Sequence, residues 1–241
     1  ARVPNYSPYA VAELAMTLGM QLFRHTSIAT TDSAAGNFKV TPNLFSKEIH
    51  SSTVGIIGAG KIGTAEARLY SGMGTKVLAS DSHPSKQAAE YVEFEPLDYV
   101  LAKSDIVSVH IPYFPGENEN FIDADFLKKM KKSAILVNTA RGEIADTKAI
   151  VEAVKNGEIA GYAGDVTVDE KDIMGHQFDS VDDIPNADVR DLAKLYPKVL
   201  LTPHMGSFTE PALEDMISIS FENFHETFTT GTNKNVLEYE G

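Results

Sequence analysis

One stretch of the chain constrains the fold more than any other. Residues 53–63 read T-V-G-I-I-G-A-G-K-I-G, an apolar run that ends in a turn with the spacing G-x-G-x-x-G. This order predicts a buried strand, a tight turn and a helix, the arrangement that binds a dinucleotide. Gly58 permits the turn, Gly60 lets backbone N–H groups approach a pyrophosphate, and Gly63 lets the helix pack against the strand.

An acidic residue follows at the distance that this motif requires. A second apolar run, K-V-L-A at residues 76–79, leads to Asp81, which lies 18 residues after Gly63. A carboxylate there accepts hydrogen bonds from ribose hydroxyls and repels a 2′-phosphate, and no arginine follows Asp81 to bind such a phosphate. A glycine motif alone also occurs in ordinary strand–turn–helix units. The strand, the helix and the acid together predict binding of NAD rather than NADP.

Size and charge restrict the classes of partner. The chain has 241 residues, enough for one large domain or for one domain and part of another. Its formal net charge of −13 argues against nucleic acid or an anionic membrane as a partner. The absence of cysteine excludes disulfides and thiolate metal sites, so we expect no metal. No apolar run is long enough to span a membrane, and we expect a cytoplasmic protein.

The order of apolar runs predicts the fold class. From Thr53 onward, continuous apolar strands alternate with helices, which indicates a parallel sheet covered on both faces. Six strands suit a Rossmann-type, doubly wound α/β fold. We expect strands at 53–58, 76–80, 105–111, 134–138, 160–165 and 198–201. We expect helices at 61–71, 84–90, 123–131 and 146–156.

Two longer helices flank this alternating region. One runs from Ser7-Pro8 to about Arg24 and is apolar nearly all round, so we expect a second face of it at a subunit interface. The other, about 209–229, carries an apolar stripe that either packs on the sheet or belongs to another domain. Residues 25–50 are expected to be loop. Residues 171–191, with six aspartates and no periodicity, are expected to form a surface excursion.

Three successive strands are followed by polar residues that suit one reaction. Arg141 follows the strand that ends at Asn138, Glu170 follows the strand that ends at Gly164, and His204 follows the strand that ends at Leu201. An open parallel sheet holds its ligands at this edge. An arginine pairs with a substrate carboxylate, a histidine donates a proton, and a glutamate orients that histidine. Singly, each is more often a surface or structural residue; together they predict a 2-oxo acid dehydrogenase.

At this point the sequence resembles the D-isomer-specific 2-hydroxyacid dehydrogenases, particularly their D-lactate dehydrogenase branch. The motifs that carry the resemblance span nearly the whole chain: R-V-P-N-Y-S-P-Y-A-V-A-E-L-A, G-A-G-K-I-G, V-H-I-P-Y, V-N-T-A-R-G, G-D-V-x-x-x-E and T-P-H-M-G-S. The resemblance implies reversible, NADH-dependent reduction of a 2-oxo acid, such as pyruvate, to the D-2-hydroxy acid. It also implies a homodimer formed through the nucleotide domain.

The resemblance also implies roles for individual residues. Arg141 would bind the substrate carboxylate, Glu170 would support the histidine, and His204 would be the proton donor; Tyr6 would lie near substrate. Cofactor contacts would involve the glycine turn, the ribose carboxylate, the next strand end and the nicotinamide side. These contacts are Gly58, Gly60, Lys61, Ile62, Gly63, Asp81, Ile111, Pro112, Asn118, Thr139, Ala140, Arg141, Asp165, His204 and Gly206.

The sequence departs from the family pattern in ways that leave alternatives open. Most of an N-terminal substrate domain is missing, and the chain begins with Ala1 rather than methionine, so we expect a piece of a longer protein that is less active alone. We expect an NAD-binding domain over 7–205 and a helix and tail of the substrate domain over 206–241. Lys171 replaces the usual proline, and Ser207 replaces an aromatic residue of lactate enzymes. D-2-hydroxyglutarate or D-2-hydroxyisocaproate dehydrogenase, or a non-catalytic NAD(H)-sensing interaction module, are the alternatives.

Overall fold

A parallel sheet of seven strands forms the centre of the molecule in the computed structural model, which describes residue 3 and residues 7–236. The strand order is β3-β2-β1-β4-β5-β6-β7, with every neighbouring pair parallel. This is the doubly wound order with one strand added, so the predicted fold class is confirmed. The strands are β1 (Thr53–Ile57), β2 (Lys76–Ser80), β3 (Glu93–Phe94), β4 (Ile106–Val109), β5 (Ile135–Asn138), β6 (Gly161–Gly164) and β7 (Val199–Leu201).

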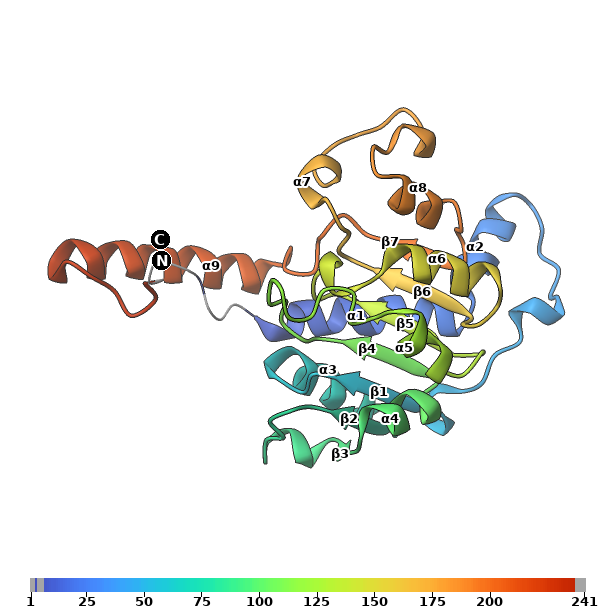
Figure 1. Cartoon of the computed structure of the whole chain (residues 1–241), viewed down its shortest axis with the longest axis horizontal. Helices are drawn as coiled ribbons and strands as arrows, with labels where there is room; N and C mark the ends of the chain where they lie inside the picture. Colours follow the sequence, from blue (N-terminus) through green and yellow to red (C-terminus); the bar gives the residue numbers. More distant parts are fainter. Residues whose placement is uncertain (1–2, 4–6, 237–241) are drawn as a thin grey trace.

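Helices cover both faces of this sheet (Figure 1). One face carries α1 and α3, which pack on each other, and the other carries α4, α5, α6 and α8. The longer helices are α1 (Pro8–Phe23), α2 (Thr26–Ala34), α3 (Lys61–Gly72), α6 (Thr147–Lys155) and α9 (Glu210–Thr230). The shorter ones are α4 (Leu97–Lys103), α5 (Ala124–Lys129), α7 (Glu170–Ile173) and α8 (Ala187–Ala193).

Alternation along the strands creates two hydrophobic cores. In β1, Val54 and Ile56 face α1 and α3, whereas Ile57 contributes to the core on the opposite face. All of these side chains are buried, because each strand has helices on both sides. The continuous apolar runs in the sequence therefore reflect burial on both faces of the sheet.

The glycine-rich turn is packed too tightly for side chains at two of its positions. Gly58 has φ +90°, a backbone conformation that L-residues rarely adopt. A Cβ on Gly63 would lie 2.1 Å from the carbonyl oxygen of Gly58, so α3 approaches the end of β1 only because residue 63 has no side chain. These contacts agree with the mechanical roles expected from the sequence.

The structure corrects several predicted element boundaries. Residues 84–90 were expected to be helical, but only a 3-10 turn forms at Ala88–Glu90. Ala88 is the only buried residue of this turn, so the segment has no apolar face to stabilise a longer helix. Residues 25–50 are not all loop, since α2 forms there with no buried residue; its threonine hydroxyls bond to carbonyls one turn earlier. The excursion at 171–191 also contains helical turns, α7 and the first part of α8.

Two elements were missing from the sequence-based prediction. β3 is only two residues long and pairs with β2 through Leu78 and Ala79, so it is too short to give a periodic signal. α4 begins directly after Pro96 and buries only Val100 and Leu101. Short elements of this kind are defined by the neighbours they pack on.

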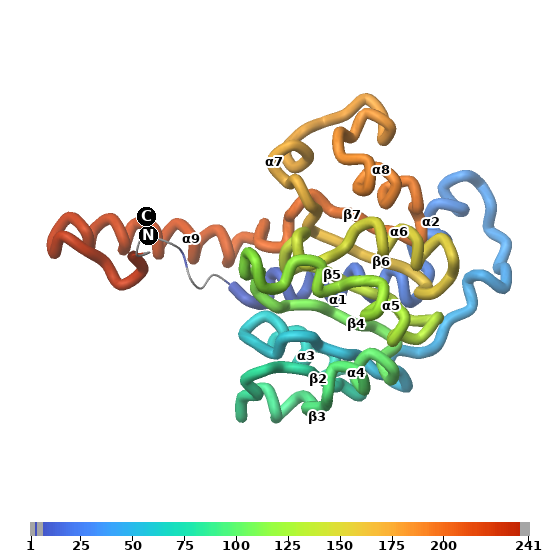
Figure 2. The backbone as a smooth tube through the Cα atoms, viewed as in Figure 1, coloured from blue at the N-terminus to red at the C-terminus, as the bar shows by residue number. Residues whose placement is uncertain are grey.

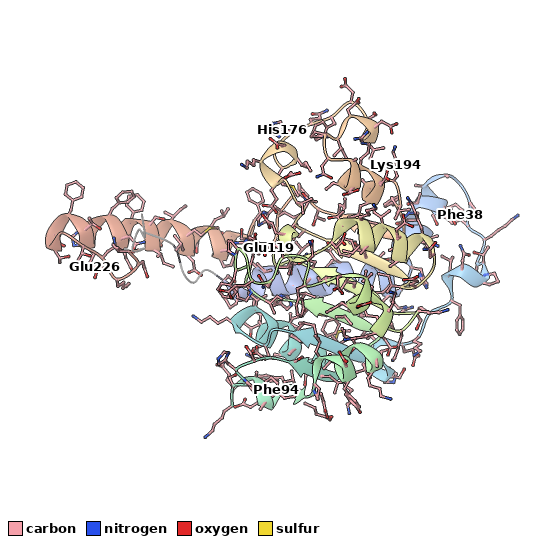
Figure 3. The ribbon with its side chains drawn as sticks, in the orientation of Figure 1. Phe38, Phe94, Glu119, His176, Lys194 and Glu226 are labelled. Carbon is pink, nitrogen blue, oxygen red and sulfur yellow. The ribbon has the colours of Figure 1, made fainter. Side chains whose placement is uncertain are left out.

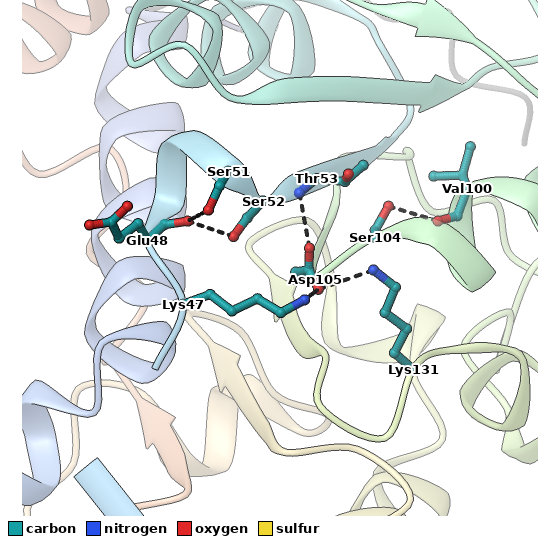
Figure 4. Close-up of polar contacts among 9 residues, drawn as sticks. All are labelled: Lys47, Glu48, Ser51, Ser52, Thr53, Val100, Ser104, Asp105 and Lys131. Carbon is teal, nitrogen blue, oxygen red and sulfur yellow. Dashed lines mark hydrogen bonds and ion pairs between the residues drawn. The ribbon is translucent and has the colours of Figure 1, made fainter. Parts of the chain in front are cut away.

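A buried carboxylate fastens the amino edge of the sheet (Figure 4). Asp105, just before β4, accepts hydrogen bonds from the ammonium groups of Lys47 and Lys131 and from the Thr53 N–H, each at 3.0 Å. Burial by itself raises the pKa of the Asp105 carboxyl, but the hydrogen bonds from Thr53 and the two lysines outweigh it and hold that pKa below its ordinary value. Asp105 thereby joins the 35–52 segment, β1 and the turn before β5.

α9 leaves the α/β body and projects away from it (Figure 1). Its apolar stripe is uncovered: Phe221 is 71% exposed and Phe228 is 91% exposed. At another side of the molecule, the segment between α2 and β1 loops outward (Figure 2). Phe38 on that segment points away from the body, and Glu226 lies on the projecting α9 (Figure 3). Among the described residues, the large apolar side chains that are at least 80% exposed all lie in these two places: Phe38, Val40, Phe45 and Phe228.

Within the described residues, no helix combines the length and apolar character needed to cross a membrane. The same residues contain no group of three or more His, Cys, Asp or Glu side chains suited to hold a metal ion.

Candidate functional site

The glycine turn presents an open surface at the start of α3. A Cβ built on Gly60 meets no protein atom within 4 Å, in contrast to Gly58 and Gly63, whose surroundings are crowded. Lys61 and Ile62 are the first two residues of α3, so their backbone N–H groups belong to its positive end. The structure therefore leaves space beside Gly60 where a pyrophosphate can approach backbone donors.

Asp81 lies at the end of β2, beside this turn. One of its carboxylate oxygens accepts the Ala59 N–H at 2.7 Å, and the other accepts the His83 N–H at 2.7 Å. Each oxygen retains a lone pair for a ribose hydroxyl. Asp81, Gly60 and Lys61 line one cavity, of about 600 Å³, which we call the α3 cavity.

A second cavity, of about 520 Å³, lies over the ends of β4, β5, β6 and β7. We call it the strand-end cavity. Its volume is in the range of small-molecule sites. Arg141 and His204, which follow β5 and β7, both line it. The other residues that line it are Val11, Ile62, His110, Ile111, Pro112, Tyr113, Thr139, Ala140, Asp165, Gly206 and Ser207.

A buried asparagine shapes the turn that carries Arg141. The Asn138 side chain accepts the Ala140 N–H at 3.0 Å and donates to the Arg141 carbonyl oxygen at 2.9 Å. One guanidinium nitrogen of Arg141 donates to the Ala140 carbonyl oxygen at 2.7 Å. The remaining guanidinium N–H groups can pair with a carboxylate.

His204 is held by the carboxylate of Glu170. Nδ1 of the imidazole lies 3.1 Å from Oε2 of Glu170, and the two side chains are 40% and 29% exposed. His204 has φ +52° and Asp169, directly before Glu170, has φ +55°, both in the left-handed region. Such a conformation costs about 1 kcal/mol for a residue with a side chain, and it recurs at functional sites.

Asp165 fixes the loop that bears His204. Its buried carboxylate accepts hydrogen bonds from the Thr202 hydroxyl at 2.6 Å, the Met205 N–H at 2.9 Å and the Gly206 N–H at 2.8 Å. Asp165 directly follows β6, and the loop follows β7, so this carboxylate joins two neighbouring strand ends. The imidazole is therefore positioned by two carboxylates: Glu170 bonds to its ring, and Asp165 bonds to the backbone of the two residues that follow it.

Two buried polar atoms of the site have no hydrogen-bond partner within the described part of the chain. They are the Thr139 hydroxyl and Oε1 of Glu170. Buried polar atoms normally have partners, so unpaired ones beside a cavity indicate a ligand or water. The residues present therefore fit a dinucleotide: there is open space beside Gly60, and the Thr139 hydroxyl at the strand-end cavity lacks a partner within the described residues.

Some sequence-predicted site residues lie elsewhere. Asn118 lines neither cavity: its amide donates to the Pro112 carbonyl oxygen and accepts the Phe114 N–H, both at 2.8 Å, so it shapes its own loop. Gly58 and Gly63 lie behind the open surface of the turn. Tyr6 is outside the described residues, so its predicted place near substrate stays a prediction.

Sequence reasoning missed a buried pair beneath the site. Nε2 of His110 lies 2.5 Å from Oε2 of Glu66 and 3.1 Å from the Ser108 hydroxyl, and the side chains of His110 and Glu66 are at most 1% exposed. Burial and the Glu66 carboxyl raise the pKa of Tyr70 well above its ordinary value. A signal was available: Ser108 and His110 alternate along an otherwise apolar strand, and Glu66 interrupts the buried face of α3.

Comparison with known proteins places this geometry in a family. Residues 16–206 match the family described as "D-isomer specific 2-hydroxyacid dehydrogenase, NAD binding domain". The chain is 37% identical, over its full length and 68% of the relative's, to 2-hydroxyacid dehydrogenase A of Aspergillus oryzae. It is 33% identical to the aromatic 2-oxoacid reductase of Clostridium sporogenes, over 98% of this chain and 70% of that protein.

Solved structures agree with the sequence comparison. The crystal structure of D-lactate dehydrogenase with NAD⁺ from Lactobacillus jensenii superposes with a TM-score of 0.89 at 35% identity, over 98% of this chain and 70% of that one. The predicted family, fold and NAD cofactor are thereby confirmed, and the chain spans about 70% of the length of that structure.

Proposed function

Because this chain belongs to the D-isomer-specific 2-hydroxyacid dehydrogenases and carries their NAD-binding domain, we propose that its reaction is the NADH-dependent reduction of a small 2-oxo acid to the D-2-hydroxy acid. Pyruvate is the first candidate, because one similar structure is that of a D-lactate dehydrogenase. The observation that carries the proposal is the placement of Arg141 and the Glu170-paired His204 at the strand-end cavity.

Arg141 is proposed to bind the substrate carboxylate. Arg141 lines the strand-end cavity, and one nitrogen of its guanidinium donates a hydrogen bond to the Ala140 carbonyl oxygen. A planar guanidinium can hold a carboxylate through two parallel hydrogen bonds, which orients the neighbouring carbonyl carbon. The turn held by Asn138 keeps this group at the end of β5.

His204 is proposed to protonate the substrate oxygen. The chemistry that NADH supplies when bound is hydride transfer to the carbonyl carbon. Glu170 accepts a hydrogen bond from Nδ1, so Nε2 is the nitrogen left to donate a proton into the cavity. Asp165 fixes the loop backbone at Met205 and Gly206, which holds the imidazole in place for that transfer.

The identity of the substrate's side chain is a separate part of this proposal. Ser207 lines the strand-end cavity where lactate enzymes of the family carry an aromatic residue, and a small side chain leaves room for a longer substrate. D-2-hydroxyglutarate and D-2-hydroxyisocaproate therefore remain alternative products. The similar Clostridium sporogenes reductase, named for aromatic 2-oxo acids, adds an aryl substrate to the panel worth testing.

We propose that residues 7–205 form the NAD-binding domain and that residues 206–241 belong to a substrate domain. The support is the uncovered stripe of α9, which includes Ile217 and Phe224 and stands clear of the sheet. Large apolar patches on a helix normally pack against another surface. A substrate domain packed there would complete the wall of the cleft and exclude water during reduction.

A homodimer through the nucleotide domain is also proposed. A groove along the outer face of α1 is lined by Met16, Met20 and Leu69, and Phe38 and Phe45 are exposed on the neighbouring outward loop. Light scattering tests the proposal: a dimer gives a mass twice the 26.2 kDa of the chain. A cytoplasmic location remains the accompanying expectation, which imaging of the tagged protein would test.

The deciding experiment combines binding and turnover. NADH binding is measured by calorimetry, and NADH oxidation is followed with pyruvate, 2-oxoglutarate, 2-oxoisocaproate and phenylpyruvate. Turnover of one acid, with chiral analysis showing the D product, supports the enzyme. Tight NADH binding without turnover of any acid would favour a non-catalytic NAD(H)-sensing module. Failure to bind NADH would contradict the role of the glycine turn.

A further inference from the structure

A cluster of cationic and aromatic side chains extends the α3 cavity beyond Asp81. Lys61 and Arg68 come from α3, Tyr9 comes from the start of α1, and His83 and Tyr91 come from the segment between β2 and β3. None of these except Lys61 and Asp81 belongs to the cofactor contacts predicted from the sequence. Three separate segments thus meet in one cavity beside the carboxylate that selects the ribose.

Arg68 is the central member of this cluster. One terminal guanidinium nitrogen donates to the Tyr9 hydroxyl at 2.9 Å, and the guanidinium carbon lies 6.0 Å from the centre of the Tyr91 ring. The side chain reaches back toward the start of α3, as long helical side chains do. These contacts hold the guanidinium at the cavity while leaving it other N–H donors for an anion.

The charged side chains that line the α3 cavity are mostly cationic, whereas the whole protein is acidic. The chain carries a formal net charge of −13, yet two permanent cations, Lys61 and Arg68, line this cavity against the single carboxylate of Asp81. Both oxygens of Asp81 already receive a backbone N–H, which lowers the repulsion they exert on a neighbouring anion. An anionic group can therefore sit next to Asp81 despite the charge of that side chain.

We propose that Arg68 forms a phosphate subsite beside the ribose position, so that the α3 cavity accepts a 2′-phosphorylated adenosine nucleotide in addition to NAD. This rests on the proposed placement of the ribose at Asp81. In the sequence, no arginine closely follows Asp81. The structure supplies one from 13 positions earlier, because α3 brings residue 68 to the same cavity.

The first test uses nucleotide fragments that differ only in the extra phosphate. Affinities for 2′,5′-ADP and 5′-AMP are measured by calorimetry for the unaltered chain and for Arg68→Gln. Loss of one charge-assisted contact should weaken 2′,5′-ADP binding by about tenfold while the 5′-AMP affinity stays within about twofold. Lys103→Gln is the matched control: it removes a cation that also rests on an aromatic ring, Tyr99, but lies outside the cavity, and it should change neither affinity.

The second test asks whether Arg68 acts on the intact coenzyme. Asp81→Asn removes the repulsion, and NADPH affinity should rise by about tenfold over the unaltered chain. In the double variant Asp81→Asn with Arg68→Gln, most of that gain should disappear. Tyr9→Phe, which removes the hydroxyl partner but keeps the guanidinium, should retain most 2′,5′-ADP affinity, and thermal unfolding confirms that each variant is folded.

Specific outcomes would overturn the subsite. One is an equal effect of Arg68→Gln on 2′,5′-ADP and 5′-AMP; another is a gain from Asp81→Asn that does not depend on Arg68. Competition by inorganic phosphate as strong as that by 2′,5′-ADP would mean a free-anion site rather than a nucleotide site. In each case NADH binding would persist. Loss of NADH and 5′-AMP binding in the unaltered chain would instead contradict the proposed function itself.

Discussion

The two edges of the sheet differ in how fully their polar groups are hydrogen-bonded. At the amino edge, Asp105 is buried and saturated by two lysines and a backbone N–H. At the carboxyl edge, the Thr139 hydroxyl and one oxygen of Glu170 have no partner in the described chain, and His204 has a left-handed backbone. At the amino edge, hydrogen bonds to the polar group stabilise the fold. At the carboxyl edge, a strained backbone conformation and unpaired polar atoms occur together, as they do at ligand-binding sites.

The largest effect is expected at the carboxyl edge. His204→Gln removes the proposed proton donor but preserves a polar side chain of similar size, and it should lower the rate of 2-oxo acid reduction by about 10²–10⁴-fold. NADH affinity should change little, because the glycine turn and Asp81 are untouched. Stopped-flow oxidation of NADH measures the rate, and calorimetry measures the affinity.

The control for this variant is Thr202→Val, which removes one of the three hydrogen bonds that Asp165 accepts from the same loop. Because the Met205 and Gly206 N–H bonds remain, a smaller loss of rate is expected. A His204→Gln variant that loses NADH affinity as strongly as turnover would contradict the assigned role.

The Glu66–His110 pair shares features of both edges: it lies at the carboxyl edge, but it is buried like Asp105. Glu66→Ala would leave His110 buried without its carboxylate, and it should lower the free energy of unfolding by about 3 kcal/mol. Glu66→Gln keeps an acceptor for His110 and should cost about 1 kcal/mol. Urea denaturation measures both; an alanine variant as stable as the unaltered chain would mean that the pair is not needed.

A smaller effect is expected at the amino edge. Asp105→Asn keeps the shape but removes the charge that holds Lys47 and Lys131, and it should lower the free energy of unfolding by about 2 kcal/mol at neutral pH. Since the pKa of Asp105 is lowered on folding, its contribution is present above the ordinary value of 3.8 and is lost as the pH falls through the folded pKa.

The two stability curves should therefore converge in acid. Denaturation at several pH values would show a difference between the unaltered chain and Asp105→Asn that shrinks below about pH 4. The Lys47 side chain is more than half exposed, so Lys47→Met should lower the free energy of unfolding by less than about 1 kcal/mol, the value of a surface ion pair. A large loss of NADH binding in any of these variants would contradict the assignment of stability to the amino edge and of ligand binding to the carboxyl edge.

Much of the site followed from the sequence because parallel strands end at one edge. Arg141 and His204 each come directly after a strand, so their convergence needed only the predicted strand order. The side chain of Asn118 is used in its own loop, which no spacing in the sequence reveals. The short β3 and the partner role of Glu66 were also not predicted, because each depends on contacts with residues distant in the chain.

By itself, the sequence determined the family and the parallel sheet and predicted candidate residues for the chemistry, because continuous apolar strands, a glycine turn and strand-end polar residues are local patterns. Only the tertiary structure decided which side chains share a cavity. Arg68 reached Asp81's cavity through the packing of α3, and α9 kept its apolar stripe in solvent, although its pattern also suited packing on the sheet. Periodicity tells which face of an element is apolar, but contact between faces depends on how separate elements pack together.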